Sequence, residues 1–264
     1  MSTAEPFAPG IATFVFKPST FEFFGVETVS TILNDPPKQA DHRIQFLGAS
    51  DTAGYCVDGT PKTGFIEEGL LGWKYEDCNS GYVSLVGRAF EADIEVFAIS
   101  GIGLTQNART KQQWQMGKLP LPGFYNRTME SDDSPDTVWN PQNFVPDLVV
   151  ISLGGNDYNH QGGDIPSNAT FSQAYEDFML RIFNQYDNKN KIAAICGMGD
   201  PTEHARSPDN DRCSPCPHVE DAVQAFKAKY GDKYAVEYIS IPCDGSVVTG
   251  DGDIGCAGHK NAIG

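Results

Sequence analysis

The sequence has little positive charge. Its 264 residues include 19 Lys and Arg against 35 Asp and Glu, which gives a formal net charge of −16 at pH 7. Nucleic acids and anionic membranes are bound through clustered Lys and Arg. We therefore expect neither of them to be a partner of this chain.

Long apolar runs are also missing. No run of about 18 apolar residues is present, so no transmembrane helix is predicted. Residues 1–20 lack the charged-then-apolar layout of a secretion signal. The 11% aromatic content argues against disorder, and the length falls between one and two domains. These features predict an acidic, globular protein.

Seven cysteines and two glycosylation sequons, at Asn126 and Asn168, favour an oxidising, extracellular setting with disulfides. In an exported protein, a signal peptide would have been removed, so this sequence would not contain it. The odd cysteine count leaves at least one thiol unpaired within the chain. A zinc knuckle at Cys213 and Cys216 would need a second ligand pair, which the sequence lacks. We expect these two cysteines to form a disulfide or to be structural thiols, and we expect no metal.

Hydrophobic periodicity changes after residue 40. Residues 1–40 show a period of two that is typical of strands, and Asp35-Pro36-Pro37 is typical of a linker, which predicts a β-rich segment at 1–40 and a main domain at 41–264. In the main domain, short apolar strands alternate with segments of helical period. A capping box at Thr170 and Gln173 is expected to open the second helix. The predicted strands are 43–47, 94–99, 147–153, 191–196 and 234–241, and the predicted helices are 82–92, which we expect to be buried, 170–182 and 219–230.

This alternation predicts an α/β domain with a five-stranded, mainly parallel sheet. Ligands of such sheets bind beyond the carboxyl ends of the strands. Ser50, Gly101 and Asn156 each follow a predicted strand, and among the five histidines only His259 follows the last one. These are the positions at which chemistry is expected.

Ester hydrolysis needs residues of these types. A serine on a sharp turn can attack a carbonyl when a histidine such as His259 takes its proton. The N–H of Gly101 and the amide of Asn156 could stabilise the resulting oxyanion. Two structural interpretations stay open: Ser50 as a helix cap, and Gly154-Gly155-Asn156-Asp157 as a tight turn.

In the order of these motifs the chain resembles the SGNH hydrolases, and within them it resembles carbohydrate esterase family 2, a family of acetyl esterases that act on plant polysaccharides. The resemblance covers roughly residues 35–264, and 145–157 is its most specific part. It implies a three-layer α/β/α sandwich of the flavodoxin type. Residues 11–40 look like the last strands of the β-sandwich that precedes the domain in this family. The similar stretches are 43–55, 98–103, 145–157 and 171–175.

The resemblance implies roles for four residues. Ser50 would be the nucleophile, His259 the base, and Gly101 and Asn156 would form the oxyanion hole with the Ser50 N–H. The implied function is a secreted serine esterase that removes O-acetyl groups from plant-type or algal polysaccharide or oligosaccharide, without a cofactor. The alternatives are a non-catalytic carbohydrate-binding or interaction protein on this fold, and an SGNH lipase or thioesterase of other acyl specificity.

The chain departs from the family at three places. Ala49 stands where the family has Asp in its Gly-Asp-Ser block. Cys256 and Ala257 stand where an acid usually precedes the histidine, so His259 is expected to be oriented by a backbone carbonyl, with Asp253 or Asp251 as the alternative. The family's closing helix does not follow His259, which is consistent with a truncated chain or with a partner chain that covers the sheet.

The polar stretch 105–146 is expected to be a long loop, which in a compact domain is usually either functional or disordered. Its aromatic residues suit sugar rings and would flank the cleft, or else they pack the loop against the sheet. They are Trp114, Phe124, Tyr125 and Trp139.

Overall fold

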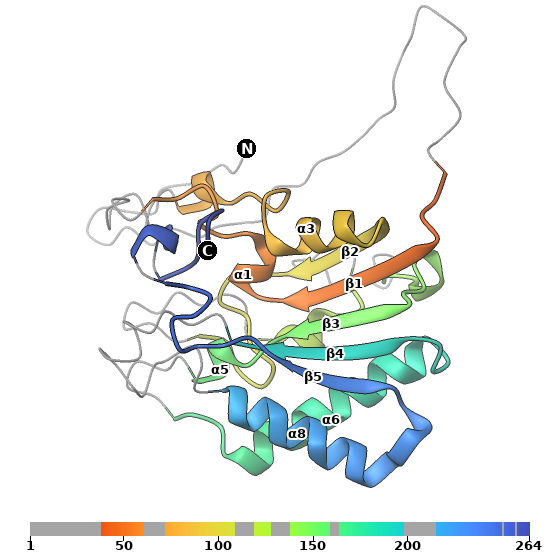
Figure 1. The fold of residues 1–264 in the computed structure, drawn as a ribbon. Coiled ribbons are helices and arrows are strands. Elements are labelled where there is room, and N and C mark those ends of the chain that lie inside the picture. The colour runs from red at the N-terminus through yellow and green to blue at the C-terminus, as the bar shows by residue number, and fades with distance from the viewer. Residues whose placement is uncertain are drawn as a thin grey trace, which may run out of the picture. The chain divides into compact units, whose positions relative to one another are not determined.

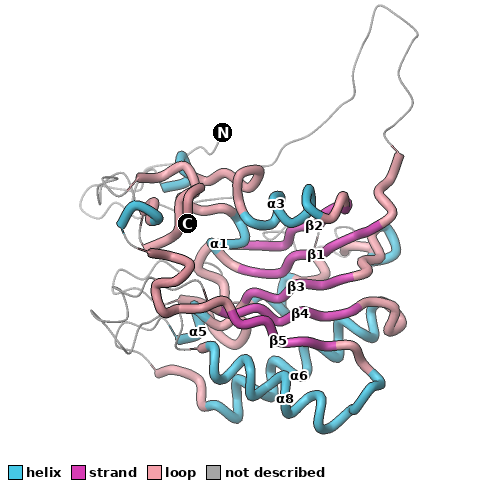
Figure 2. The backbone as a smooth tube through the Cα atoms, in the orientation of Figure 1, coloured by secondary structure: helices cyan, strands magenta, loops and turns pink. Residues whose placement is uncertain are grey.

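The computed structural model (Figures 1 and 2) describes residues 38–60, 72–108, 119–127, 138–158, 164–197, 215–249, 251–256 and 258–264. The chain divides into two units, residues 1–39 with 126–140, and residues 40–125 with 141–264. The expected β-rich segment 1–40 and its linker lie almost wholly outside the described residues. In the first unit, Arg127 and Val138 form an isolated antiparallel bridge. The second unit contains the sheet.

Five parallel strands form this sheet in the order β2-β1-β3-β4-β5. This is the flavodoxin-like order, and it confirms the predicted α/β class. The strands lie where the apolar runs predicted them, within two residues at either end. Their bounds are β1 His42–Gly48, β2 Ala92–Ala98, β3 Leu148–Ser152, β4 Lys191–Cys196 and β5 Val236–Ser240.

Three longer helices pack on the sheet, α3 (Tyr82–Ala89), α6 (Asn168–Gln185) and α8 (Cys216–Tyr230). In Figure 1, α3 lies by β1 and β2, and α6 and α8 lie together. None of the described helices is long and apolar enough to cross a membrane. The short helices are α1 Ser50–Ala53, α4 Leu121–Phe124 and α5 Gly155–Tyr158, and the 3₁₀ turns are Gly72–Tyr75, Pro141–Asn143, Gly231–Lys233 and Asp251–Asp253.

The two faces of the sheet have different cores, because alternate residues of a strand point to opposite faces. Leu47, Val149 and Ile151 belong to the larger apolar cluster, which holds the buried sides of α6 and α8. Phe46 and Val150 belong to a smaller cluster with α3. The domain is therefore a three-layer sandwich in which one helical layer is thinner.

The thinner layer explains one wrong prediction. Val83 of α3 is fully buried, but Leu85 is 53% exposed and Phe90, just after the helix, is 64% exposed. Only one side of the helix thus packs on the sheet, and apolar residues on its other side are exposed. The expectation of a buried helix there does not hold.

The start of α6 also differs from expectation. The N-cap is Ser167, whose side chain accepts a hydrogen bond from the Thr170 N–H at 3.1 Å. Gln173 instead donates to Asp177 one turn further on. The helix therefore begins one turn earlier than the predicted capping box, because Ser167 offers a cap oxygen first.

Two of the four aromatic residues singled out in 105–146 are buried in the core. Phe124 and Tyr125 are 5% and 2% exposed and belong to the larger core. Trp139 belongs to the first unit, and Trp114 lies outside the described residues. The structure thus favours packing over cleft contact for Phe124 and Tyr125.

Candidate active site

A cavity of about 200 Å³ opens at the carboxyl ends of the strands. Its walls come from the last residues of β3 and β4, from the segments that follow β1, β2, β3 and β4, and from His259. Strands β1 and β3 are neighbours whose connections lead to opposite sides of the sheet, which is the switch point where α/β folds bind ligands. The cavity therefore lies where the topology favours a site, and it includes Ser50, Gly101, Asn156 and His259.

The turn that carries Ser50 is tight. A Cβ atom added at Gly48 would lie 2.0 Å from Thr52 Oγ1 and 3.2 Å from the Ser152 carbonyl oxygen, so only glycine fits there. Ala49 is the N-cap of α1 and packs against the larger core. At the position where the family carries Asp, this chain thus has an apolar contact. Ser50 follows as the first residue of α1.

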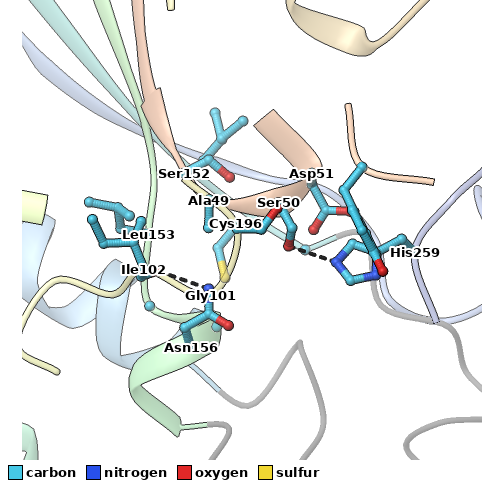
Figure 3. Close-up of a pocket in the computed structure, with 16 residues that line it drawn as sticks. Ala49, Ser50, Asp51, Gly101, Ile102, Ser152, Leu153, Asn156, Cys196 and His259 are labelled. Carbon is cyan, nitrogen blue, oxygen red and sulfur yellow. Dashed lines mark hydrogen bonds between the residues drawn. The ribbon is translucent and has the colours of Figure 1, made fainter. Parts of the chain in front are cut away.

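Ser50 meets the predicted histidine. His259 Nε2 lies 2.6 Å from Ser50 Oγ, within hydrogen-bonding distance (Figure 3). Each of the two residues is 9% exposed. The Tyr55 ring meets the His259 ring edge-on, with centroids 4.8 Å apart. The structure thus pairs a buried serine with a buried imidazole across 209 residues of sequence.

Hydrogen-bond donors lie on the same cavity. Gly101 has a φ of 82°, a backbone conformation that favours glycine. Asn156 Nδ2 donates one hydrogen to the Ile102 carbonyl at 2.8 Å, which fixes the amide and leaves its second hydrogen available (Figure 3). Among the described residues, the N–H groups of Ser50 and Gly101 donate to no protein acceptor.

Asp157 is a residue that the sequence interpretation did not single out. Its fully buried carboxylate accepts bonds from the Leu104 N–H at 2.8 Å and from the Thr105 N–H and hydroxyl, both at 2.6 Å. The Gln106 N–H adds a fourth bond at 3.2 Å. Burial raises the pKa of Asp157, although these hydrogen bonds act in the opposite direction. Asp157 thereby ties the loop after β2 to the helix that carries Asn156. The signal in the sequence is the acid that ends the block Gly154-Gly155-Asn156-Asp157, shortly after a strand.

The acid next to His259 stays a prediction. Asp253 Oδ2 accepts hydrogen bonds from the N–H and hydroxyl of Thr249, at 2.6 and 2.7 Å. The side chain of Asp251 lies outside what the structure describes. Ala257, one of the positions where the family usually has an acid, is also outside the described residues. The orientation of the His259 imidazole by a backbone carbonyl likewise stays a prediction.

Cysteine pairing differs from the expectation for Cys216. It is bonded to Cys196 at the end of β4, not to Cys213, which lies outside the described residues. Cys56 is bonded to Cys256, 200 residues away, and Cys78 is free and exposed. Within the described residues, no three His, Cys, Asp or Glu side chains gather as a metal site.

Two other described histidines lie elsewhere. His42 begins β1, at the edge of the sheet away from the cavity. His218 lies in α8, stacked on Tyr158 with centroids 5.0 Å apart. His160 and His204 lie outside the described residues.

Known esterases are similar to this chain in sequence, although no family model matches it. The chain is 29% identical over 177 residues to the cellulase/esterase CelE of Acetivibrio thermocellus, which covers 67% of this chain and 20% of that protein. It is 27% identical over 159 residues to an acetylxylan esterase / glucomannan deacetylase of Cellvibrio japonicus, covering 59% of this chain and 41% of that protein.

Solved structures of carbohydrate esterases are also similar to this chain. The carbohydrate esterase family 2 enzyme plus carbohydrate binding domain from Corynascus thermopiles (Myceliophthora fergusii) superposes with a TM-score of 0.66 and 26% identity, over 86% of this chain and 63% of that chain. The chain resembles carbohydrate esterase family 2. The family two esterase from Clostridium thermocellum in complex with cellohexaose shares the fold, with a TM-score of 0.66 and 23% identity. The chain spans a fifth to two fifths of the length of these curated relatives.

Proposed function

We propose that this protein is a serine esterase that removes O-acetyl groups from carbohydrate. The observation that carries the proposal is the 2.6 Å contact between Ser50 Oγ and His259 Nε2 on the wall of a cavity. A serine needs such a base in reach to become a nucleophile at neutral pH. The four site residues are the ones at which the chain resembles the family.

In the acylation step, His259 accepts the Ser50 proton while Ser50 Oγ attacks the acetyl carbonyl. Negative charge then develops on the carbonyl oxygen. The N–H groups of Ser50 and Gly101 and the free amide hydrogen of Asn156 are available to stabilise it. His259 returns the proton to the sugar oxygen, which leaves as a hydroxyl, and acetyl remains on Ser50.

In the second step, water replaces the sugar. His259 takes a proton from the water, the resulting nucleophile attacks the acetyl-enzyme, and acetate leaves as Ser50 regains its proton. The same imidazole thus serves both half-reactions. This arrangement needs no cofactor.

The small cavity supports acetyl as the acyl group. Its volume is about 200 Å³, and Leu153, Ile195 and Cys196 contribute apolar surface to it. An acetyl methyl needs little apolar room, whereas a long acyl chain would need a groove leading out of the cavity. The names of the relatives, acetylxylan esterase and glucomannan deacetylase, support an acetylated carbohydrate as substrate. The Cys56–Cys256 and Cys196–Cys216 disulfides support an oxidising, extracellular location.

Hydrolysis of 4-nitrophenyl acetate tests the enzyme proposal. Ser50→Ala and His259→Ala should each lower kcat by at least about 10³-fold, since the nucleophile or the base is gone. Matched controls are Ser172→Ala on α6 and His42→Ala at the start of β1, which should keep wild-type rates. Background rates in both the wild type and Ser50→Ala would rule out an esterase. Binding of an unacetylated oligosaccharide by such an inactive protein would support the non-catalytic alternative.

Acetate release from acetylated xylan and glucomannan, measured against esters of longer acids, tests the substrate class. We expect acetyl to be preferred, because the cavity is small. Faster cleavage of an octanoyl ester than of the acetyl ester would favour the lipase or thioesterase alternative.

A further inference from the structure

The segment that carries His259 is joined to the segment that carries Ser50 at several points. Cys56 and Cys256 form a disulfide with their Cα atoms 5.4 Å apart, and both are buried. Further along, the Ala262 N–H donates to the Val57 carbonyl at 2.9 Å. We call residues 255–262 the histidine strap.

Backbone hydrogen bonds within the strap link the position of His259 to that of Cys256. The His259 N–H donates to the Cys256 carbonyl at 2.9 Å, and the Gly255 N–H donates to the His259 carbonyl at 2.8 Å. These two bonds close a small turn whose one end is the disulfide and whose other end is the imidazole. A shift of Cys256 would therefore move His259.

A second link lies beside the reacting pair. Lys260 Nζ is 3.2 Å from Asp51 Oδ1, and the Lys260 side chain is only 10% exposed. Asp51 directly follows Ser50, and Lys260 directly follows His259. The ion pair thus joins the same two segments one residue beyond the contact between Ser50 and His259.

From these contacts we propose that Cys56, Cys256, Asp51 and Lys260 are positioning residues that hold His259 against Ser50, so that hydrolysis requires the Cys56–Cys256 disulfide. This inference rests on the proposed esterase function. A dithiol reductant would inactivate the enzyme: the S–S bond breaks, two thiols form with two electrons and two protons from the dithiol, and the dithiol becomes its own cyclic disulfide. Oxidation would restore activity.

The test uses the double variant Cys56→Ser/Cys256→Ser in a Cys78→Ser background, which removes the exposed free thiol and prevents exchange with it. Cys78→Ser alone is the control and should behave as the wild type. We expect kcat of the double variant to fall by about 10²-fold, because a misplacement of about 1 Å costs that much. KM should change less than about twofold, since substrate contacts other than His259 remain. A variant that folds and keeps more than half of wild-type kcat would overturn the proposal.

Lys260 provides the second variant, in case loss of the disulfide prevents folding. Lys260→Gln should lower kcat several-fold, and Lys260→Arg should restore most of it, because an arginine can still pair with Asp51. If Lys260 had a purely structural role, Lys260→Gln would lower the stability of the protein without lowering kcat selectively over KM. Equal kcat in Lys260→Gln and the wild type would contradict the positioning role of the ion pair.

Hydrogen exchange separates failure of this inference from failure of the proposed function. The amides of Gly255, His259 and Ala262 should exchange at least about tenfold faster in the double variant, or in the reduced wild type, than in the oxidised wild type. That result needs no catalysis. Labelling of Ser50 by a fluorophosphonate tests the function independently. If the oxidised wild type is not labelled, the result counts against the esterase function. If amide exchange is unchanged and all forms are labelled at equal rates, the result counts against the positioning role of the strap.

Discussion

A single added methyl group should displace the histidine strap. Gly255 lies against the backbone of the segment after Ser50: a Cβ atom added there would be 2.1 Å from the Cys56 carbonyl oxygen and 3.3 Å from Cys56 Cβ. The obstacle at 2.1 Å is a backbone atom, and the disulfide holds it in place. Gly255→Ala therefore cannot be accommodated by turning a side chain aside.

The size of the displacement follows from this contact. A non-bonded carbon and oxygen separate to roughly 3.2 Å, so the strap must move by about 1 Å. A displacement of that size between reacting groups costs about 10²-fold in rate. The Ser50–His259 contact of 2.6 Å would lengthen beyond hydrogen-bonding range. We thus expect kcat to fall by about 10²-fold.

The assay compares two alanine variants in the same segment. An added Cβ atom at Gly252 would meet nothing within 4 Å, so Gly252→Ala is the matched control. Steady-state hydrolysis of 4-nitrophenyl acetate should show the loss in Gly255→Ala only. Thermal unfolding, followed by circular dichroism, verifies that both variants are folded at the assay temperature. Activity of folded Gly255→Ala within threefold of Gly252→Ala would refute the reasoning.

Three further predictions concern other parts of the domain. Asn156→Ala should lower kcat by about 10²–10³-fold, measured with the same ester, because one oxyanion donor is lost. Burial raises the pKa of Glu95. The stability linked to its titration is therefore present below the unfolded pKa and lost as pH rises through the folded pKa. Glu95→Gln should raise the melting temperature at pH 7, and this gain should vanish near pH 4. Ser167→Ala should destabilise the protein by about 1 kcal/mol in urea unfolding, because the Thr170 N–H loses its cap; unchanged stability in either stability variant would contradict its prediction.

The sheet and the four site residues could be predicted because they depend on local signals. Each buried parallel strand is an apolar run, and the carboxyl ends of such strands meet at one edge. Ser50, Gly101 and Asn156 lie two, three and four residues beyond the ends of β1, β2 and β3, so the topology brings them together. His259 could be chosen among five histidines because it follows the last strand.

The supports of the site could not be predicted in this way. The Cys56–Cys256 disulfide and the Asp51–Lys260 pair join segments about 200 residues apart, and no local pattern encodes their partners. The Asp157 carboxylate likewise meets a loop 51–53 residues away. The exposure of Leu85 on α3 depends on how many helices cover that face, which periodicity does not reveal.

The base is the last of the site residues along the chain. The Ser50 turn and the donors at Gly101 and Asn156 all precede β5 in the chain, whereas the base comes 209 residues after the nucleophile. A chain made only as far as β4 would thus contain the nucleophile and the oxyanion donors but not the base. Under the proposed role of the histidine strap, formation of the Cys56–Cys256 bond would then be the step that completes the catalytic pair.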